Sequence, residues 1–353
     1  MKKLVIVQTV TPDYRAVFFD TIQAALGNRF ELYAGDFYFQ KSIKSDNSIE
    51  KRSIKNFYFF GRKLLFQFGL MHLLFNNDAL VLEMNPRILS NWIILIFRKI
   101  TNKETILWGH AWPREGQSSK TNRLRKIMQR LASQIVVYTN TQRDELAKVM
   151  SSKTILSATN SVISSKDMTT NADENGIKNI LFIGRLVADK KPLFLLQSFH
   201  SIIESLPKTT SLIIAGEGPE SEKLQQYIIE HNLEKRVFLK GHVGNYEELK
   251  KLYFQSLFST SPGYVGLSAI QSFGFGVPML VSKDENHSPE IEAVNEWNST
   301  FFETDNIDSC GIEILKYFKN KNKWVSTREK IVEHCKKNYS AENMTQTFIK
   351  LVK

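Results

Sequence analysis

The chain has 353 residues, of which 42% are hydrophobic and 24% charged. This composition excludes a disordered chain, and the length exceeds one typical core and fits two domains of ordinary size. The net charge is +11, and residues 1–170 carry all of the excess because they hold 25 Lys and Arg against 13 Asp and Glu.

The apolar run near the start, from Leu4 to Val7, stops at Gln8 and is followed by polar residues. It therefore predicts a β-strand and not the apolar core of a secretory signal. The most apolar later stretch, residues 88–97, is too short to span a bilayer. Cys310 and Cys335 lack metal-ligand spacing, which suits a reducing compartment. We therefore expect a cytoplasmic protein.

In chain order, the first half alternates short apolar runs with amphipathic segments. Continuous Val, Ile and Leu runs predict strands at residues 4–10, 30–33, 80–82, 105–108, 135–138 and 154–156. Helical spacing predicts helices at residues 14–26, 63–75, 87–100, 122–132 and 141–150. Strands of this kind are buried on both faces, so the pattern predicts a parallel sheet covered by helices.

The basic residues of the first half gather at residues 51–63, 98–99 and 120–130. The first of these stretches is interleaved with the aromatic run 57–60 and with Leu64, Leu65, Phe66 and Phe68. No nucleic-acid-binding module is recognisable, so nucleic acid is not an expected partner. The mixture favours contact with an anionic membrane surface, here the inner face of the plasma membrane. A solvated basic face over an ordinary core is the alternative.

Residues 160–178 are polar and form the best linker of the chain. The alternation then resumes, with strands predicted at residues 179–183, 211–215, 236–239, 257–259 and 278–282 and helices at 192–205, 220–232, 246–255 and 267–275. Helices are predicted from there to the end. This order predicts an α/β fold of two Rossmann-like domains whose parallel sheets face a central cleft. The expected domains are residues 1–165 and 166–335, with a C-terminal helix in 336–353 that packs back on the first domain.

Three loops in the second half follow predicted strands and precede helices, where open α/β sheets bind their ligands. In the first, Gly184 ends a strand, and Arg185 and Lys190 lie five residues apart. Such a pair can converge on one diphosphate, since Arg gives forked hydrogen bonds and Lys a point charge. Solvated side chains at a strand end are the alternative.

The other two loops are rich in glycine. Gly216 and Gly218 permit either a close approach of the backbone to a ligand or merely a tight turn. Gly263 and Gly266 bracket a loop that runs into a helix, where backbone N–H groups would be available. Three such loops in order indicate a phosphate-binding edge more strongly than any one of them.

These motifs resemble the family-4 glycosyltransferases of the GT-B fold. The resemblance is carried by Gly184-Arg185-Leu186 with Lys190, by Ala215-Gly216-Glu217-Gly218-Pro219 and by Gly276-Val277-Pro278. It covers residues 179–295 and extends more loosely to both ends. Near the start, Pro12-Asp13-Tyr14-Arg15 followed by Phe18-Phe19 is similar to members that build bacterial surface polysaccharides such as capsule and O-antigen.

The resemblance implies roles for individual residues. Arg185 and Lys190 would neutralise the donor diphosphate as it leaves, which stabilises the transition state electrostatically. Gln271 would reach the ribose of a nucleotide-sugar. The remaining implied donor contacts are Gly184, Gly216, Glu217, Gly218, His242 and Val243 near the base, and Gly263, Tyr264, Val265, Gly266 and Leu267 around the phosphates and the sugar.

One departure from the family pattern stands out. Typical members carry two glutamates spaced E-x7-E around this loop and helix, whereas this chain has a shorter loop through Tyr264 and Val265 and has Gln271 on the helix. Gln271 can still donate to and accept from hydroxyl groups. The resemblance implies retaining transfer without a carboxylate nucleophile, so the loss of the acids does not forbid the chemistry.

Further candidates follow other strands. His110 comes after the strand at 105–108. The resemblance implies that it contacts the donor sugar, and the alternative is a strand-end histidine bound to backbone. Asp13 is a candidate for orienting or deprotonating an acceptor, or else the N-cap of the next helix. Glu83 is a third acid at a strand end. His287 and Glu290 would meet the donor sugar, or Glu290 would belong to a helix start.

No Asp-x-Asp motif and no His/Cys set with metal spacing occurs. We therefore expect no metal or other cofactor, with Arg185 and Lys190 in the cation's place. The predicted function is retaining transfer of a hexosyl or related sugar from a nucleotide-sugar to a lipid-linked saccharide. A sugar-nucleotide epimerase and a non-catalytic partner subunit of the same fold are the alternatives. A nicotinamide oxidoreductase is disfavoured because no glycine fingerprint follows the first strand.

Overall fold

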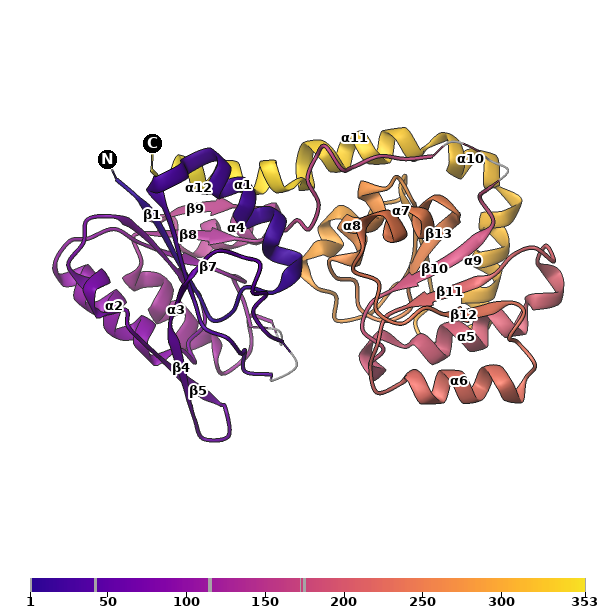
Figure 1. The fold of residues 1–353 in the computed structure, drawn as a ribbon, viewed down its shortest axis with the longest axis horizontal. Coiled ribbons are helices and arrows are strands. Elements are labelled where there is room, and N and C mark those ends of the chain that lie inside the picture. The colour runs from indigo at the N-terminus through magenta and orange to yellow at the C-terminus, as the bar shows by residue number, and fades with distance from the viewer. Residues whose placement is uncertain (1, 41–42, 114–115, 172, 174–175, 353) are drawn as a thin grey trace. The chain divides into compact units, whose positions relative to one another are not determined.

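The computed structural model describes every residue except 1, 41–42, 114–115, 172, 174–175 and 353. The chain divides into two compact units (Figure 1). The first unit comprises Met1–Ser164 and Tyr339–Lys353, and the second comprises Ser165–Asn338. The divisions expected from the sequence, after residues 165 and 335, lie close to these boundaries.

The first unit is built on a seven-stranded sheet of order β3-β2-β1-β6-β7-β8-β9, in which all strand pairings are parallel. Its strands are β1 (Leu4–Gln8), β2 (Phe30–Ala34), β3 (Arg52–Ser53), β6 (Ala79–Glu83), β7 (Thr105–Trp108), β8 (Gln134–Val137) and β9 (Thr154–Ser157). Its helices are α1 (Ala16–Leu26), α2 (Leu89–Ile100), α3 (Asn122–Leu131), α4 (Asn140–Val149) and α12 (Ala341–Lys350).

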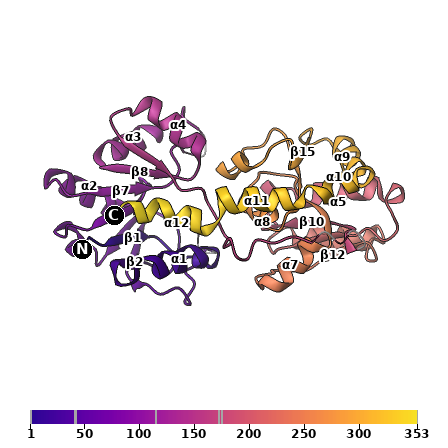
Figure 2. The ribbon, with the colours of Figure 1, turned by 90° about the horizontal axis from the view of Figure 1, so that it is seen from above.

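The strands of this sheet are buried on both faces, as the apolar runs predict. In β1, Leu4 and Ile6 join the core beneath α1 and α12. Val5 and Val7 point the opposite way, into the core beneath α2, α3 and α4. Side chains alternate along a strand, so one continuous apolar run serves two cores. Figure 2 shows α12 lying beside α1.

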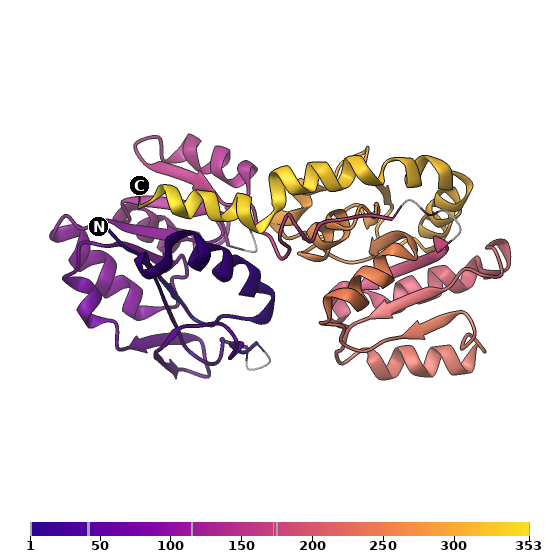
Figure 3. The same ribbon diagram turned by 45° about the horizontal axis from the view of Figure 1, so that its top comes forward.

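The second unit has a six-stranded parallel sheet of order β12-β11-β10-β13-β14-β15. Its strands are β10 (Asn179–Ile183), β11 (Leu212–Ala215), β12 (Val237–Leu239), β13 (Ser256–Ser261), β14 (Met279–Ser282) and β15 (Ser299–Phe302). Its helices are α5 (Pro192–Ser201), α6 (Ser221–Glu230), α7 (Tyr246–Phe254), α8 (Ser268–Gly274), α9 (Ile307–Lys319), α10 (Lys321–Ser326) and α11 (Arg328–Tyr339), which runs one residue beyond the unit. In Figures 1 and 3, α5 and α6 lie on one side of this sheet, and α7 and α8 lie on the other.

The helix predicted over residues 63–75 is wrong. The segment instead forms β5 (Leu64–Phe68), which pairs with β4 (Lys55–Phe59) in an antiparallel hairpin, and then a 3₁₀ helix over Met71–Leu74. The hairpin turns through three consecutive residues of positive φ, at Phe60, Gly61 and Arg62. Side chains alternate between the two faces of the hairpin, which gives a period of two. In so short an aromatic run this period cannot be told from helical spacing.

The expectation of helices alone after residue 282 is also wrong. β15 (Ser299–Phe302) adds a sixth parallel strand, in register with β14 from Met279 to Ser282. β15 is the edge strand of this sheet, opposite the edge formed by β12. A four-residue strand with only its first and last residues buried leaves too short a pattern to recognise in the sequence.

Arg98 does not belong to the basic surface on which the sequence interpretation placed it. It is fully buried on α2. Its guanidinium donates to the carbonyl oxygens of Leu73, Asn76, Asp78 and Glu104 at 2.6 to 3.0 Å, and so links α2 to its neighbours. Within the part of the chain that the structure describes, no helix is long and apolar enough to cross a membrane.

Candidate functional site

The order of strands in the second unit locates a binding edge. β10 pairs with β11 on one side and with β13 on the other, so the direction of chain progress reverses between β10 and β13. Open α/β sheets bind ligands at the carboxyl ends of the strands at such a point. The loops that follow β10 and β13, residues 184–191 and 262–267, are two of the three loops singled out in the sequence.

Glycine lets the three loops touch. A Cβ atom on Gly216 would overlap the carbonyl oxygen of Gly184, and a Cβ atom on Gly263 would overlap that of Asp189. These two glycines are therefore required where the loop after β10 meets its neighbours on either side. The structure thus brings together the three loops that the sequence predicted to form one edge.

Lys190 and Arg185 both lie on the loop after β10. The Lys190 ammonium donates to the carbonyl oxygen of Tyr264 at 2.7 Å and lies 3.6 Å from the centroid of its ring. This contact is a cation–π interaction across the two loops. The Arg185 side chain is exposed. The edge therefore carries one cation held at the β13 loop and one open to solvent.

The turns after β11 and β12 are tied to the same loop. Leu186 donates its N–H to the carbonyl of Glu217 at 2.9 Å, and Gly216 donates to Gly241 at 2.7 Å. The Glu217 carboxylate accepts from the N–H of His242 at 3.4 Å. Of the residues expected near a base, His242 is exposed and Val243 is buried, and Gly218 packs on Leu186.

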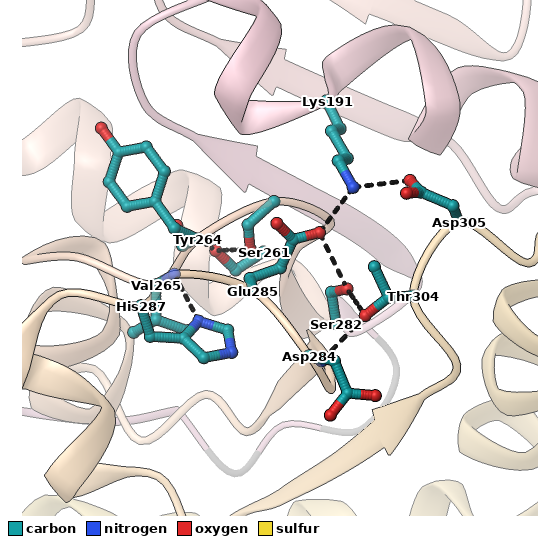
Figure 4. Close-up of polar contacts among 11 residues, drawn as sticks. Lys191, Ser261, Tyr264, Val265, Ser282, Asp284, Glu285, His287, Thr304 and Asp305 are labelled. Carbon is teal, nitrogen blue, oxygen red and sulfur yellow. Dashed lines mark hydrogen bonds and ion pairs between the residues drawn. The ribbon is translucent and has the colours of Figure 1, made fainter. Parts of the chain in front are cut away.

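The loop after β13 is held from behind by the segment after β14, as Figure 4 shows. Val265 donates its N–H to Nδ1 of His287 at 3.0 Å and accepts from the N–H of Ser288 at 3.0 Å. Burial lowers the pKa of His287, while the carbonyls of Lys283 and Ser282 oppose that effect. A neutral imidazole that accepts at Nδ1 follows from this geometry. His287 thus shapes the loop from its back, and the Val265 N–H is already occupied.

The next predicted residues lie on or just before two short helices. Gly266 and Leu267 lead into α8, on which Gln271 lies. The hydroxyl of Tyr253 donates to Oε1 of Gln271 at 3.1 Å, which leaves the Nε2 donors of the amide for another partner. Glu290 is buried in a 3₁₀ helix over Pro289–Ala293 that begins with proline. The helix-start role of this segment is therefore realised.

An ion-pair network beside the loop was missed in the sequence. Lys191, which has a left-handed backbone, donates to Glu285 at 2.6 Å and to Asp305 at 2.5 Å (Figure 4). Burial alone would lower the pKa of Lys191, but the hydrogen bonds to Asp305 and Glu285 raise it above the usual value. Glu285 also accepts from Ser282 at 3.2 Å. Lys191 therefore anchors the start of α5 to the ends of β14 and β15.

The first unit has its own reversal point, between β1 and β6. Here the Glu83 carboxylate accepts from the N–H of Thr9 at 2.5 Å and from its hydroxyl at 2.8 Å. Burial raises the pKa of Glu83, although these two hydrogen bonds oppose the rise. Asp13 is exposed in a 3₁₀ turn and accepts from the N–H of Tyr14 at 2.8 Å. It does not cap α1, whose N-cap residue is Arg15.

His110 follows β7 and is held by its backbone and its ring. Arg125 donates to the carbonyls of Met84 and His110, at 2.7 and 2.8 Å, and so ties the ends of β6 and β7 together. The imidazole lies 4.7 Å from the ring of Tyr138. Desolvation by the surrounding protein lowers the pKa of His110 to about 4, and the charges of Arg125 and Arg15 add to the effect, although the residue as a whole is exposed. His110 is therefore a neutral group at neutral pH.

Among the described residues, no group of three or more His, Cys, Asp or Glu side chains could hold a metal ion. The carboxylates of Glu285 and Asp305 are both bound to Lys191. The loop after β10 carries the cations of Arg185 and Lys190 together with the exposed carboxylate of Asp189.

Comparison with known proteins relates the second unit to a family. Residues 165–338 match the family described as glycosyl transferases group 1. Over 172 residues the chain is 27% identical to the poly(glycerol-phosphate) alpha-glucosyltransferase of Bacillus subtilis, covering 48% of this chain and 24% of that protein. The chain spans less than half the length of the curated relatives that it matches.

Solved structures align over the whole chain. HepE from Anabaena, in complex with UDP, superposes with a TM-score of 0.73 at 14% identity, covering 100% of this chain and 99% of that one. Sucrose-phosphate synthase from Thermosynechococcus elongatus gives a TM-score of 0.68 at 15% identity, with 100% and 98% covered. At such identity the likeness establishes the fold, which is GT-B, with two Rossmann-like domains. Residues 165–338 therefore match the group 1 glycosyltransferase domain family, and the chain as a whole has the GT-B fold.

Proposed function

We propose that this chain transfers a sugar from a nucleotide-sugar to a saccharide acceptor. The observation that carries the proposal is the single edge in the second unit where the loops after β10, β11 and β13 pack on one another through Gly216 and Gly263. That edge presents Arg185 and Lys190 at the reversal point of the sheet. A diphosphate is the ligand whose charge and size fit such a pair.

Lys190 and Arg185 would act on the leaving group. As the bond between the sugar and the diphosphate breaks, negative charge grows on the phosphate oxygens, and two fixed cations stabilise it. Tyr264 holds the Lys190 ammonium in place through its carbonyl and its ring. Because this pair supplies the positive charge, we propose that transfer needs no added metal, and activity in a chelator tests this point.

Gln271 and His110 would recognise the donor. The Tyr253 hydroxyl fixes the Gln271 amide so that its Nε2 group can donate to a ribose hydroxyl. A neutral His110 can exchange a hydrogen bond with a sugar hydroxyl without adding charge. We propose retention of the anomeric configuration, as the family resemblance implies, and the product's anomeric NMR signal tests it.

The acceptor would be a lipid-linked saccharide in the synthesis of a bacterial surface polysaccharide. Support comes from the first unit, whose reversal point carries Glu83, Thr9 and the exposed Asp13. A matched relative is, by its name, an alpha-glucosyltransferase that acts on poly(glycerol-phosphate). A hexosyl donor is proposed on the same ground.

A thermal-shift screen of UDP-, GDP- and TDP-sugars, followed by transfer assays, tests the function. Arg185→Ala and Lys190→Ala should each reduce transfer by about 100-fold or more, because each removes a cation from the developing charge. Lys208→Ala, at an exposed lysine of the same unit, is the matched control and should leave transfer unchanged.

Three outcomes would contradict the proposal. Undiminished transfer in both loop variants would remove the assigned site. An epimerised nucleotide-sugar formed without an acceptor would identify a sugar-nucleotide epimerase. A folded protein that responds to none of the nucleotide-sugars would identify a non-catalytic partner subunit.

A further inference from the structure

The β4–β5 hairpin has two chemically different faces. The register pairs Phe57 with Phe66 and Lys55 with Phe68, so alternate residues share a face. The face turned toward the unit, here called the inner face, carries Asn56, Tyr58, Leu65 and Gln67. The opposite face, here called the aromatic face, carries Lys55, Phe57, Phe59, Leu64, Phe66 and Phe68. Figure 1 shows the hairpin projecting from the first unit.

The inner face is fastened to the end of β1. Gln67 donates to the carbonyl of Gln8 at 3.2 Å, and Asn56 donates to that of Thr9 at 2.8 Å. Leu65 is fully buried and donates its N–H to the carbonyl of Arg87. The hairpin therefore cannot turn its aromatic face inward without losing these bonds.

The turn of the hairpin is braced as well. Arg87 donates to the carbonyls of Arg62 and Lys63, each at 2.7 Å. Arg62 in turn donates to the carbonyls of Phe39 and Tyr38 and stacks on the ring of Tyr58. The aromatic face is thus presented on a rigid support and not on a loose loop.

The aromatic face is open to solvent. Phe57 and Phe68 are 47% and 50% exposed, and Phe60 at the tip is 76% exposed. The rings pack mainly against one another, with centroids of Phe57 and Phe59, and of Phe66 and Phe68, 4.8 Å apart. Such a contiguous apolar patch on a surface marks an interaction site.

The charge around the patch has one sign. Residues 51–77 contain five Lys and Arg and no Asp or Glu. Lys55, on the aromatic face, and Lys63, at its tip, are exposed. Arg52 is paired with Glu31, which leaves Lys55 and Lys63 as the exposed lysines of the hairpin. Apolar rings flanked by these two cations complement the interface of an anionic bilayer, where the rings enter the boundary of the acyl chains and the cations meet the headgroups.

We propose that the aromatic face of the β4–β5 hairpin docks on a bilayer that contains anionic lipids. The role of this docking rests on the proposed function, in which the first unit binds the acceptor. The inner face of the hairpin is bonded to Thr9, at the reversal point of the first unit. A lipid-linked saccharide anchored in the same bilayer would be presented near this strand end.

Vesicle flotation of the full chain tests the proposal. The wild-type protein should float with vesicles of phosphatidylcholine and phosphatidylglycerol at low salt, and less at high salt, because ions screen the attraction. The variant Phe57→Ser/Phe60→Ser/Phe68→Ser should lose about tenfold or more of this binding. Phe238→Ser/Ile312→Ser, at exposed apolar residues of the second unit, is the matched control and should bind like the wild type.

A charge variant keeps the test independent of ring packing. Lys55→Glu/Lys63→Glu should also lose about tenfold or more of the binding, since each basic residue near the surface contributes to it. Lys208→Glu/Lys235→Glu, at exposed lysines of the second unit, should not. Circular dichroism melts of all four variants establish that they are folded.

Several results would overturn the proposal. They are absence of wild-type flotation at low salt, hairpin variants that float as well as the wild type, and a dimer that the ring variant dissociates, as seen by light scattering. The thermal shift with a UDP-sugar should be equal in the wild type and in the hairpin variants. A wild-type protein whose melting temperature does not change with the nucleotide-sugar would count against the proposed function and not against the docking surface.

Discussion

At the scale of single residues, His110 is tuned by its surroundings. Its pKa of about 4 lies below the usual 6.5, so the ring stays mostly neutral as the pH falls from 7 and gains its charge around pH 4. A proton NMR titration should therefore show a His110 midpoint well below 6.5, with His110→Gln used to assign the signal. Arg125→Met removes a neighbouring positive charge and should raise the midpoint. A wild-type midpoint near 6.5 would contradict the structure.

A substitution at Gly263 tests how the loops after β10 and β13 pack on each other. In Gly263→Ala, the added methyl group meets the backbone of Asp189 and Lys190, so the loops after β10 and β13 must move apart. We expect a loss of about 1–3 kcal/mol in the free energy of unfolding, typical of overpacking, together with weaker nucleotide-sugar binding. Chemical denaturation and calorimetric titration measure the two effects.

The matched control for this change is Gly176→Ala, since a Cβ atom there meets nothing within 4 Å and the backbone is not left-handed. It should leave stability within about 0.5 kcal/mol of the wild type. Equal behaviour of the two alanine variants would show that the loops do not depend on Gly263.

At the scale of elements, the sequence predicts the parts of the fold that repeat. Runs such as residues 179–183 are buried on both faces, and β10 begins and ends at those residues. The hairpin was missed because Leu64 to Phe68 are all apolar or uncharged, and the strand is recognised only through its pairing with β4. β15 was missed because its four residues acquire a pattern only beside β14.

The candidate site divides in the same way. The loop glycines and the pair Arg185 and Lys190 lie in contiguous motifs, so the sequence identifies them. Lys191 bonds to Glu285 and Asp305, which lie 94 and 114 positions away in the sequence. A local sequence pattern cannot predict partners at such separations. An acid two residues before His287, close after a strand, was the available signal for Glu285.

Arg98 provides a prediction at this scale, because its one side chain holds α2 to the segments before β6 and β7. In Arg98→Met, several buried carbonyl groups lose their donor, and we expect a loss of about 3 kcal/mol or more in the free energy of unfolding. Urea denaturation measures it. Lys99→Met, at the exposed neighbour, should change stability by less than about 0.5 kcal/mol. Similar effects of both substitutions would place Arg98 outside the core.

At the scale of the whole molecule, each unit has cores of its own. The largest core of the second unit draws only on residues 177–325, a continuous part of the chain. The core beneath α1 in the first unit draws on both ends of the chain, since it includes Ile6 as well as Met344 and Phe348. Substitutions in the core of α12 should therefore lower the stability of the first unit, although α12 follows the second unit in the chain.

Phe348→Ala tests this dependence. The Phe348 ring is fully buried, with its centroid 5.2 Å from that of Phe18 and 4.8 Å from that of Trp108, so its removal leaves a cavity in the first unit. We expect a loss of about 3–5 kcal/mol in the stability of that unit. The transition of the second unit, identified in calorimetry as the one shifted upward by the nucleotide-sugar found in the thermal-shift screen, should stay in place because the loops after β10, β11 and β13 lie wholly in Ser165–Asn338. Phe301→Ala, at a partly exposed ring of β15, is the control in the other unit. If Phe348→Ala showed a single transition at a lower temperature, the two units would unfold together. The ligand-shifted transition would then report on both units.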